Sequence, residues 1–285
     1  MTTMVTVSSE PRLKAYAGFV KLEHTIFSLP LIYAGAFLHS RPSMRLMGLI
    51  LLAATGGRVM AMGLNRIIDA KIDRCNPRTQ RRELPRGAMH VVEAWFIVLV
   101  ASALYAWSAA AIAPICLRLA PIPVALFVLY PYLKRVTALA HLGLGLTWSM
   151  APLGGWLAMS QSLAHFAEVR WLWLFSVLWV TGFDIIYATM DEAFDRGHGL
   201  RSIPAEAGKA PALTLAAALH AAAFLMLGAL WANQLKSPVS FAFLLAIGVL
   251  FIWQHLVAER RPEFAFFQLN GVIGFLVFGL VVTGV

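Results

Sequence analysis

The stretch NRIIDAKID, residues 65–73, ends a long apolar run and decides how the rest of the chain is organised. A second stretch, DIIYATMDEAFD at residues 184–195, closes another apolar run in the same way. The glutamates are scattered along the chain, but every aspartate lies in one of these two stretches: Asp69, Asp73, Asp184, Asp191 and Asp195. Short carboxylates are therefore required in two particular places.

The composition around these stretches is that of a membrane protein. Of the 285 residues, 60% are hydrophobic and only 13% are charged. The mean hydropathy of +0.73 excludes an ordinary soluble protein. Because a spanning helix needs ~20 mainly apolar residues, nine candidate spans can be counted. They run approximately over residues 25–38, 46–64, 94–113, 121–132, 139–160, 171–190, 212–233, 241–257 and 264–285.

These runs predict an all-α fold, a polytopic membrane helical bundle of nine transmembrane helices around a central cavity. The fourth run is short, and we expect it to begin before Pro121. The chain is interpreted as a single domain, residues 1–285. The interval from Asp69 to Asp191 equals that from Asp73 to Asp195, which suggests two similar halves. The predicted halves are residues 25–135 and 139–260, with a ninth helix at 264–285.

The distribution of positive charge predicts the orientation of the bundle. Most of the 23 Lys and Arg residues fall in the N-terminal segment and in alternate connections, and cytoplasmic connections carry such an excess. We expect a multi-pass protein of the cell membrane, with a cytoplasmic N-terminus and both aspartate stretches on the cytoplasmic side. The net charge of +9 follows from this topology. It does not indicate nucleic-acid binding, because no soluble basic surface with exposed aromatic residues is evident.

Helical spacing places the polar residues of the first stretch on one face. Arg58, Asn65, Asp69 and Asp73 fall within a sector of about 80° at 3.6 residues per turn. Arg58 is a charge inside an apolar run, and such residues usually serve a function.

The second stretch shows a similar pattern when it is taken as one continuous helix. Asp184, Tyr187, Asp191 and Asp195 then fall within a stripe of about 80°. Glu192 points elsewhere, and we interpret it as a solvated or capping residue.

These residue types indicate a magnesium site. Carboxylate and amide oxygens on two helices suit Mg²⁺ better than zinc or copper, and no His or Cys cluster competes. Mg²⁺ normally binds through one or two carboxylates plus substrate phosphates. The two stretches would thus hold two or more ions that bridge a diphosphate. The predicted metal ligands are Asn65, Asp69, Asp73, Asp184, Asp191 and Asp195.

Basic side chains on the same predicted face suit the phosphate oxygens. The connection NPRTQRRELPRG, residues 76–87, is rich in arginine, and the guanidinium fork matches phosphate geometry. The apolar helices would dissolve a long hydrophobic tail, so a lipid diphosphate fits both ends of the bundle. The basic residues predicted to bind the diphosphate are Arg78, Arg82, Lys134 and Arg201.

A cation transporter is the alternative from another class of protein, because acidic residues inside a membrane often line an ion pathway. Against this alternative, the aspartates lie at one predicted face beside arginines. No acidic residue lies at mid-depth in the later runs.

Taken together, the motifs resemble those of the UbiA superfamily of intramembrane aromatic prenyltransferases, especially 4-hydroxybenzoate polyprenyltransferases. The resemblance covers nearly the whole chain. The matching motifs are Asn65-x3-Asp69-x3-Asp73, the Arg-Thr and Arg-Glu-Leu-Pro-x-Gly that follow it, Tyr130-Pro with Lys134-Arg135, and Asp184-x2-Tyr187-x3-Asp191-x3-Asp195. The resemblance implies Mg²⁺-dependent transfer of a polyprenyl group from its diphosphate to the aromatic ring carbon ortho to a hydroxyl, in quinone synthesis.

The resemblance also implies roles for single residues. Arg58, Asn65, Lys134 and the aspartates would line the diphosphate and metal site. The reaction would pass through an allylic carbocation, with Asp191 assisting the acceptor. Tyr130 and Tyr187 would shape the carbocation pocket through their π faces.

The chain departs from the family pattern at Arg82-Glu83-Leu84-Pro85, where many members have Arg-Pro-Leu-Pro. The segment 182–204 is similar to that of an offshoot linked to menaquinone formation. The acceptor therefore stays open between 4-hydroxybenzoate or a similar acid, a futalosine-derived aromatic, a glycerol phosphate lipid and a haem vinyl group. The expected partners are a polyprenyl diphosphate, a small aromatic acceptor and membrane lipid, with no obligatory protein partner.

Overall fold

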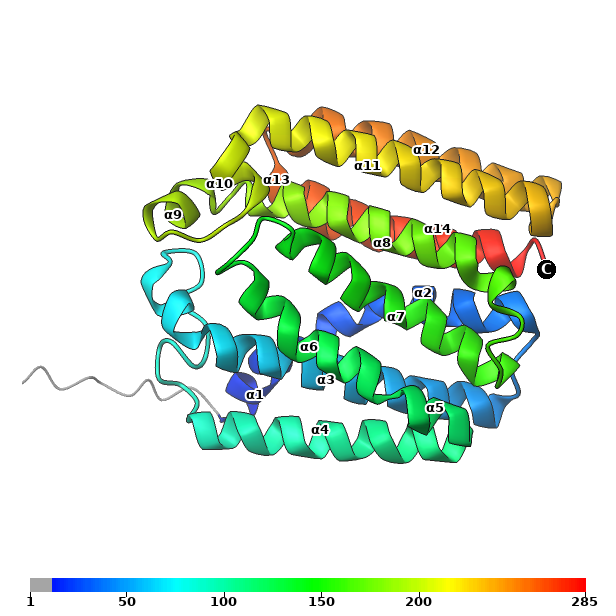
Figure 1. Cartoon of the computed structure of the whole chain (residues 1–285), viewed down its shortest axis with the longest axis horizontal. Helices are drawn as coiled ribbons and strands as arrows, with labels where there is room; N and C mark the ends of the chain where they lie inside the picture. The colour runs from blue at the N-terminus through cyan, green and yellow to red at the C-terminus, as the bar shows by residue number, and fades with distance from the viewer. Residues whose placement is uncertain (1–11) are drawn as a thin grey trace, which may run out of the picture.

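The computed structural model describes residues 12–285, apart from the side chains of residues 13 and 22–27. Every regular element within these residues is a helix, which confirms the predicted all-α class (Figure 1). In chain order the elements are α1 (Arg12–Val20), α2 (Leu22–His39), α3 (Met44–Cys75), α4 (Val91–Ile112), α5 (Pro114–Leu119), α6 (Pro121–Leu133), α7 (Ala140–Ser160), α8 (Phe166–Ala188), α9 (Glu192–Gly197), α10 (Ile203–Ala207), α11 (Lys209–Leu230), the π-helix η1 (Trp231–Leu235), α12 (Pro238–Ala258), α13 (Pro262–Phe264), the π-helix η2 (Ala265–Leu269) and α14 (Asn270–Val282).

Seven stretches of helix in the described part of the chain are long and apolar enough to cross a membrane. They are Met44–Cys75, Val91–Ile112, Pro114–Leu133, Phe166–Ala188, Lys209–Leu235, Pro238–Ala258 and Pro262–Val282. The third of these begins at Pro114, as the short fourth run led us to expect. The other two predicted runs are helical as well: α7 has 21 residues, and α2 contains the shorter apolar helix Ser28–His39. The count of nine spans and the cytoplasmic N-terminus stay predictions.

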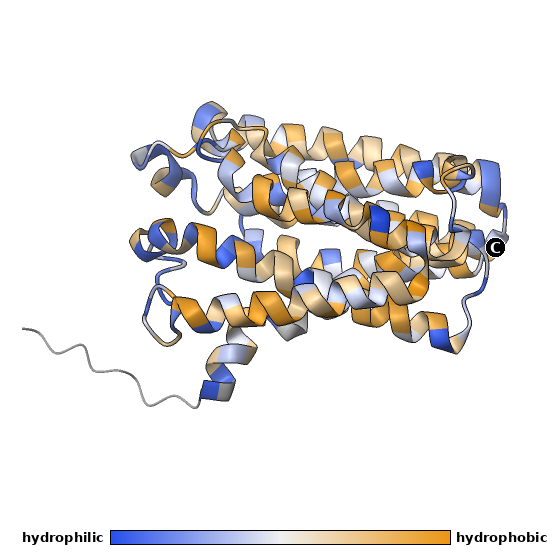
Figure 2. Cartoon of the chain, turned by 60° about the horizontal axis from the view of Figure 1, so that its bottom comes forward, coloured by the Kyte–Doolittle hydropathy of each residue, from blue (hydrophilic) through white to orange (hydrophobic). Residues whose placement is uncertain are grey.

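The helices run back and forth, so their connections gather at two ends of the bundle (Figure 1). The loop after α3, the short helices α9 and α10, and α1 lie at the same end. Figure 2 shows hydrophilic residues concentrated at the two ends and hydrophobic residues along the helices between them. The two aspartate stretches, at the ends of α3 and α8, therefore reach one polar end together.

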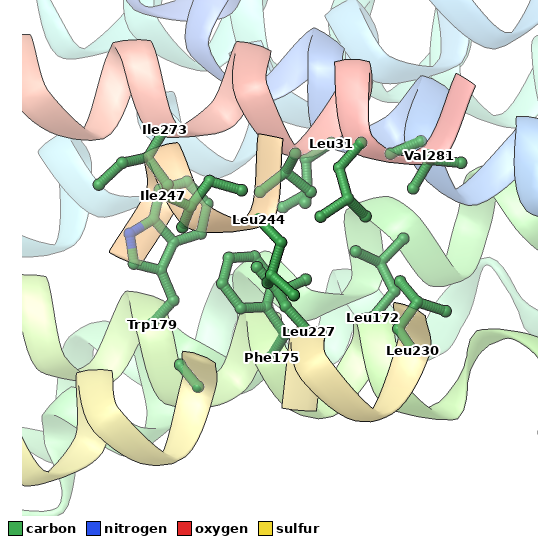
Figure 3. Close-up of a cluster of buried hydrophobic side chains, with 14 of the residues drawn as sticks. Leu31, Leu172, Phe175, Trp179, Leu227, Leu230, Leu244, Ile247, Ile273 and Val281 are labelled. Atoms are coloured by element: carbon green, nitrogen blue, oxygen red, sulfur yellow. The ribbon is translucent and has the colours of Figure 1, made fainter. Parts of the chain in front are cut away.

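The largest apolar core lies where α2, α8, α11, α12 and α14 meet. Figure 3 shows the side chains that fill it, with Phe175 and Trp179 of α8 against Leu227 of α11 and Ile247 of α12. The rings of Phe175 and Trp179 stack with centroids 5.2 Å apart. This well-packed core fixes the position of α8. It thereby also fixes the second aspartate stretch, which begins near the end of α8.

Helices α2 and α7 cross so closely that their backbones touch. A Cβ on Gly35 of α2 would overlap the carbonyl oxygen of Pro152, and a Cβ on Gly155 of α7 would overlap that of Ile32. Small residues allow such close approach of membrane helices. The crossing joins two of the helices that line the cavity described below.

We predict that Gly155→Ala destabilises the protein by about 1–3 kcal/mol, because the added methyl group overpacks a contact between backbones. Gly154→Ala is the matched control: it lies next to Gly155 on α7, and a Cβ there meets nothing within 4 Å. Thermal unfolding in detergent measures the difference. Equal midpoints for the two variants would contradict the close crossing.

Candidate active site

The first aspartate stretch lies on one uninterrupted helix, α3, which has 32 residues. Asp69 and Asp73 are 2% and 5% exposed. Lys134, at the end of α6, donates from Nζ to Asp69 Oδ2 at 2.6 Å, and Asn65 Nδ2 donates to the same oxygen at 3.2 Å. Arg135 Nη2 lies 3.5 Å from Asp69 Oδ1. The predicted association of Asn65, Asp69 and Lys134 is therefore present.

The loop between α3 and α4 folds back onto the end of α3. Arg82 Nη1 donates to Asp73 Oδ2 at 2.7 Å, and the Thr79 hydroxyl donates to the Asp73 carbonyl oxygen at 3.1 Å. Arg82, one of the predicted diphosphate ligands, is thus held directly beside a predicted metal ligand.

The predicted single stripe of the second stretch is wrong, because α8 ends at Ala188. The amides of Thr189, Met190 and Asp191 each bond the carbonyl three residues earlier, at 3.3, 3.1 and 3.0 Å. The Thr189 hydroxyl also donates to the Ile186 carbonyl at 2.7 Å, and such local bonding competes with a continuing α-helix. A new short helix, α9, begins at Glu192, which carries Asp191 and Asp195 out of the α8 periodicity.

Asp191 connects this turn to the loop after α3. Its Oδ1 accepts from Asn76 Nδ2 and from Arg78 Nε, both at 2.9 Å, and its Oδ2 accepts from Arg78 Nη2. Arg78 also donates to the Tyr187 hydroxyl, and its guanidinium carbon lies 4.6 Å from the centre of the Tyr187 ring. The two aspartate stretches are therefore physically joined, through a residue predicted to bind phosphate.

Burial alone would lower the pKa of Arg78, but its hydrogen bonds to Asp191 and Tyr187 and the negative charge of Asp191 raise it above the ordinary value. Arg78 therefore keeps its positive charge at every physiological pH. For Asp195, burial raises the pKa of the carboxyl group, and the hydrogen bond from the Ser202 hydroxyl, 2.8 Å long, opposes this effect.

Asp184 has a partner that sequence reasoning missed. His141, buried in the first turn of α7, lies with Nδ1 2.7 Å from Asp184 Oδ2. The backbone amide of Ile203 donates to His141 Nε2 at 3.3 Å, so Nδ1 carries the proton given to the carboxylate. A single His at the start of an apolar run has no periodic signal that would have identified it. Asn76 was identifiable in principle, because it directly follows the last turn of α3.

Two predicted ligands lie apart from the aspartates. The Arg201 side chain pairs with Glu206 at 3.5 Å, while its backbone amide donates to the Lys134 carbonyl at 2.7 Å. Arg58 lies 11 residues before Asp69 on α3, which is about 16 Å along the helix axis. Neither side chain contacts a carboxylate of the two stretches in the described part of the chain.

Arg58 instead lines a cavity of about 300 Å³ enclosed by α2, α3, α4, α5, α6 and α7. Its guanidinium carbon lies 5.6 Å from the centre of the Trp148 ring, and its buried Nε has no hydrogen-bond partner. Tyr130 lines the same cavity and lies one helical turn before Lys134, which pairs with Asp69. Tyr130 therefore lies where the apolar cavity meets the polar end.

The donor chemistry of the polar end fits Mg²⁺. The available ligands are carboxylate and amide oxygens, which Mg²⁺ prefers, and the buried Asp69 Oδ1 accepts no hydrogen bond. No three acidic, His or Cys side chains of the described residues converge on one point. The predicted set of six metal ligands therefore stays a prediction.

Comparison with known proteins agrees with this description of a membrane helical bundle that has an acidic and basic polar end. The chain belongs to the UbiA prenyltransferase family, which it matches over residues 28–278. It is therefore a prenyltransferase, built from several membrane helices.

The relatives extend over nearly the whole chain. An apo UbiA homologue from Aeropyrum pernix K1 superposes with a TM-score of 0.83 at 34% identity, over 92% of this chain and 98% of that one. The 4-hydroxybenzoate octaprenyltransferase of Coxiella burnetii (strain CbuK_Q154) is 28% identical over 272 residues, covering 93% of this chain and 91% of the relative. A UbiA homologue from Archaeoglobus fulgidus bound to DMAPP and Mg²⁺ shares the fold, with a TM-score of 0.71 at 19% identity, over 95% and 99% of the two chains.

We predict that Asp69→Ala and Asp191→Ala each abolish prenyl transfer, with a loss of more than about a hundredfold in kcat/KM. Each change removes the carboxylate that holds one side of the joined polar end. Glu192→Ala is the control, because its carboxylate follows Asp191 in the chain but pairs with Arg196 at 2.9 Å. Activity near that of the wild type in either aspartate variant would contradict the hypothesis that both stretches form one active site.

Proposed function

We propose that this prenyltransferase transfers a polyprenyl group from its diphosphate to the ring carbon ortho to the hydroxyl of 4-hydroxybenzoate or a similar aromatic acid, with Mg²⁺ as cofactor. The observation that carries the proposal is the connection of the two aspartate stretches through Arg78 and Asp191. An apolar cavity lined by Arg58 and Tyr130 lies in the same bundle. Carboxylates, phosphate-binding cations and an apolar space are the three features that a lipid diphosphate requires.

Contacts in this chain and the ligands described for related structures both support a prenyl diphosphate as the donor. In this chain, Lys134, Arg78 and Arg82 lie within hydrogen-bond distance of Asp69, Asp191 and Asp73, respectively. Related structures from Archaeoglobus fulgidus are described as bound to DMAPP or GPP together with Mg²⁺. Bound Mg²⁺ would neutralise charge on the diphosphate and so make it a better leaving group.

The residues of this chain contribute to the bond-breaking step by electrostatics. The bond between the allylic carbon and its oxygen breaks, and the electron pair leaves with the diphosphate. Lys134 and Arg82 stabilise the charge that develops on that group from the positions in which hydrogen bonds already hold them. Arg78 adds its charge when it turns from Asp191 toward the diphosphate. The Tyr130 and Tyr187 rings stabilise the allylic cation through their π faces. The apolar cavity wall excludes water that would otherwise quench this cation.

Carbon–carbon bond formation follows at the acceptor ring. The ring carbon ortho to the hydroxyl attacks the allylic cation, and the proton on that carbon then passes to a base. Asp191 is the residue we assign to assisting the acceptor. Both of its oxygens accept hydrogen bonds from Arg78, so this role requires Arg78 to turn toward the diphosphate.

The position of Arg58 favours the acceptor over the diphosphate as its ligand. Helical side chains lean toward the N-terminus of their helix, so the Arg58 side chain leans away from Asp69. A buried guanidinium needs an anionic partner, and the carboxylate of an aromatic acid supplies one within the cavity. We therefore assign Arg58 to the acceptor carboxylate, in place of the diphosphate role expected from the sequence.

The proposed setting is the cell membrane, with the polar end on the cytoplasmic side. A water-soluble aromatic acid reaches this end from the cytoplasm, while the prenyl donor diffuses to it within the bilayer. The predicted excess of Lys and Arg on that side supports this orientation.

Mass spectrometry of the products tests the proposal directly. The purified protein is incubated with a polyprenyl diphosphate, Mg²⁺ and a panel of phenolic acids, futalosine-derived aromatics, glycerol phosphate lipids and haem. We expect a prenylated aromatic acid, no product after addition of EDTA, and recovery with Mg²⁺. If prenylation occurs only on one of the other acceptors, the assignment of an aromatic acid as acceptor is wrong. If no product forms and the protein instead takes up a cation into liposomes along a sodium gradient, the protein is a transporter and the proposed reaction is wrong.

Arg58→Ala separates the two substrates. We predict that KM for the aromatic acid rises by about tenfold or more, the effect of losing one hydrogen bond between charged groups, while KM for the prenyl diphosphate changes little. Steady-state kinetics with each substrate varied in turn gives both values. A larger rise in the KM for the prenyl diphosphate would indicate that Arg58 binds the diphosphate. An equal rise in both KM values would indicate a structural role.

A further inference from the structure

A buried ion pair lies next to the candidate site and takes no part in the chemistry proposed above. Arg66 of α3 donates from Nη1 to the Glu83 carboxylate in the loop between α3 and α4. Arg66 is 5% exposed and Glu83 is 9% exposed. The Arg66 Nε has no hydrogen-bond partner. A pair that is buried to this extent is weak evidence for stability, because desolvation of the two charges opposes their attraction.

The helix α1 covers this ion pair. Phe19 of α1 is fully buried, and the Arg66 guanidinium carbon lies 5.7 Å from the centre of its ring. A Cβ on Gly18 would overlap Glu83 Oε1. Helix α1 therefore packs directly against the end of the Glu83 side chain, and a side chain on residue 18 would force that carboxylate to move.

Further contacts hold α1 against the loop. Phe19 packs with Leu84 and Met89 of the loop and with Ala94 of α4. The Tyr16 hydroxyl donates to Glu93 Oε1 at 2.8 Å. Figure 1 shows α1 at the end of the bundle that carries this loop. The contact thus joins α1, α3, the loop and the start of α4.

The position of Glu83 determines the position of its neighbour Arg82. Arg82 Nη1 reaches Asp73 Oδ2 at 2.7 Å, and its backbone amide donates to the Thr79 carbonyl at 2.9 Å. On the other side of Glu83, the Ala88 amide donates to the Glu83 carbonyl at 2.9 Å. With Glu83 held by Arg66 under α1, the loop presents Arg82 to the polar end in one register.

We propose that the Arg66–Glu83 pair, clamped by α1 at Gly18, is a positioning device that sets Arg82 for the diphosphate of the prenyl donor. This inference rests on the donor assignment of the proposed function. Arg66 and Glu83 act through Arg82 and do not touch the substrate. This role explains why the chain has a glutamate at position 83, where many UbiA-like sequences have a proline.

Gly18→Ala tests the proposal from outside the site. The added Cβ displaces the Glu83 carboxylate from Arg66 and leaves every charge of the polar end unchanged. We expect KM for the prenyl diphosphate to rise about tenfold, as when one charge-assisted hydrogen bond is lost. The inhibition constant of inorganic diphosphate with Mg²⁺ should rise by the same factor. The kcat and the KM for the acceptor should stay within about twofold of the wild-type values, below the effect of any lost hydrogen bond.

Gly48→Ala is the matched control, because Gly48 lies within a helix and a Cβ there meets nothing within 4 Å. Its kinetic constants should equal those of the wild type. Glu83→Gln is the second variant, because it keeps the shape of the side chain and removes the charge. It should raise KM for the donor as Gly18→Ala does, and the double variant should show no further increase, because both changes break one contact.

The outcomes separate this inference from the proposed function. If the wild-type protein transfers no prenyl group, the proposed function fails. If the wild type is active and both variants keep their donor KM, the positioning role fails. The positioning role also fails if kcat, both KM values and the thermal midpoint all change, because that is the behaviour of a purely structural contact. It fails as well if the effects of Gly18→Ala and Glu83→Gln on the donor KM add up in the double variant.

Discussion

The polar end of this enzyme depends on the pairing of buried carboxylates with cations from other segments. An ionised carboxylate that is removed from water needs compensating partners. Lys134 from the end of α6 supplies one for Asp69, and Arg82 and Arg78 from the loop after α3 supply those for Asp73 and Asp191. Segments far apart in the chain are therefore brought together by charge, at the end of helices that are otherwise held by apolar packing.

The cations that stabilise the folded polar end are the same residues that we propose as ligands of the diphosphate. Arg78 connects the loop to Asp191 and Tyr187, and Lys134 connects α6 to Asp69. These basic side chains lose their conformational freedom when the protein folds. A polyanion that replaces the carboxylates as their partner therefore binds side chains that are already ordered. Preorganisation of the site thus follows from the way in which the fold compensates its own buried charge.

The sequence predicted those features that depend on local patterns. The apolar runs marked all the long helices, and the four-residue spacing placed Asn65, Asp69 and Asp73 on one continuous helix. It did not predict the end of α8 at Ala188, because helical periodicity continues through a stretch where the Thr189 hydroxyl and a tight turn compete for the backbone carbonyls. It also missed His141, whose pairing with Asp184 joins residues of two different helices. The location of Arg58 in the cavity became clear only from the length of helix that separates it from Asp69.

The turn at residues 189–191 gives the two halves of the polar end different tolerance to change in evolution. One residue inserted into α3 between Asn65 and Asp73 would rotate the residues that follow by about 100° and move them to another face. Beyond Asp195, the segment from Arg196 to Gly208 consists of the end of α9, a connection and the short helix α10, so its length can vary while Asp195, α8 and α11 keep their places. Insertions and deletions among relatives should therefore concentrate in this segment, and exchanging it between relatives offers a route to altered selectivity in an unchanged membrane bundle.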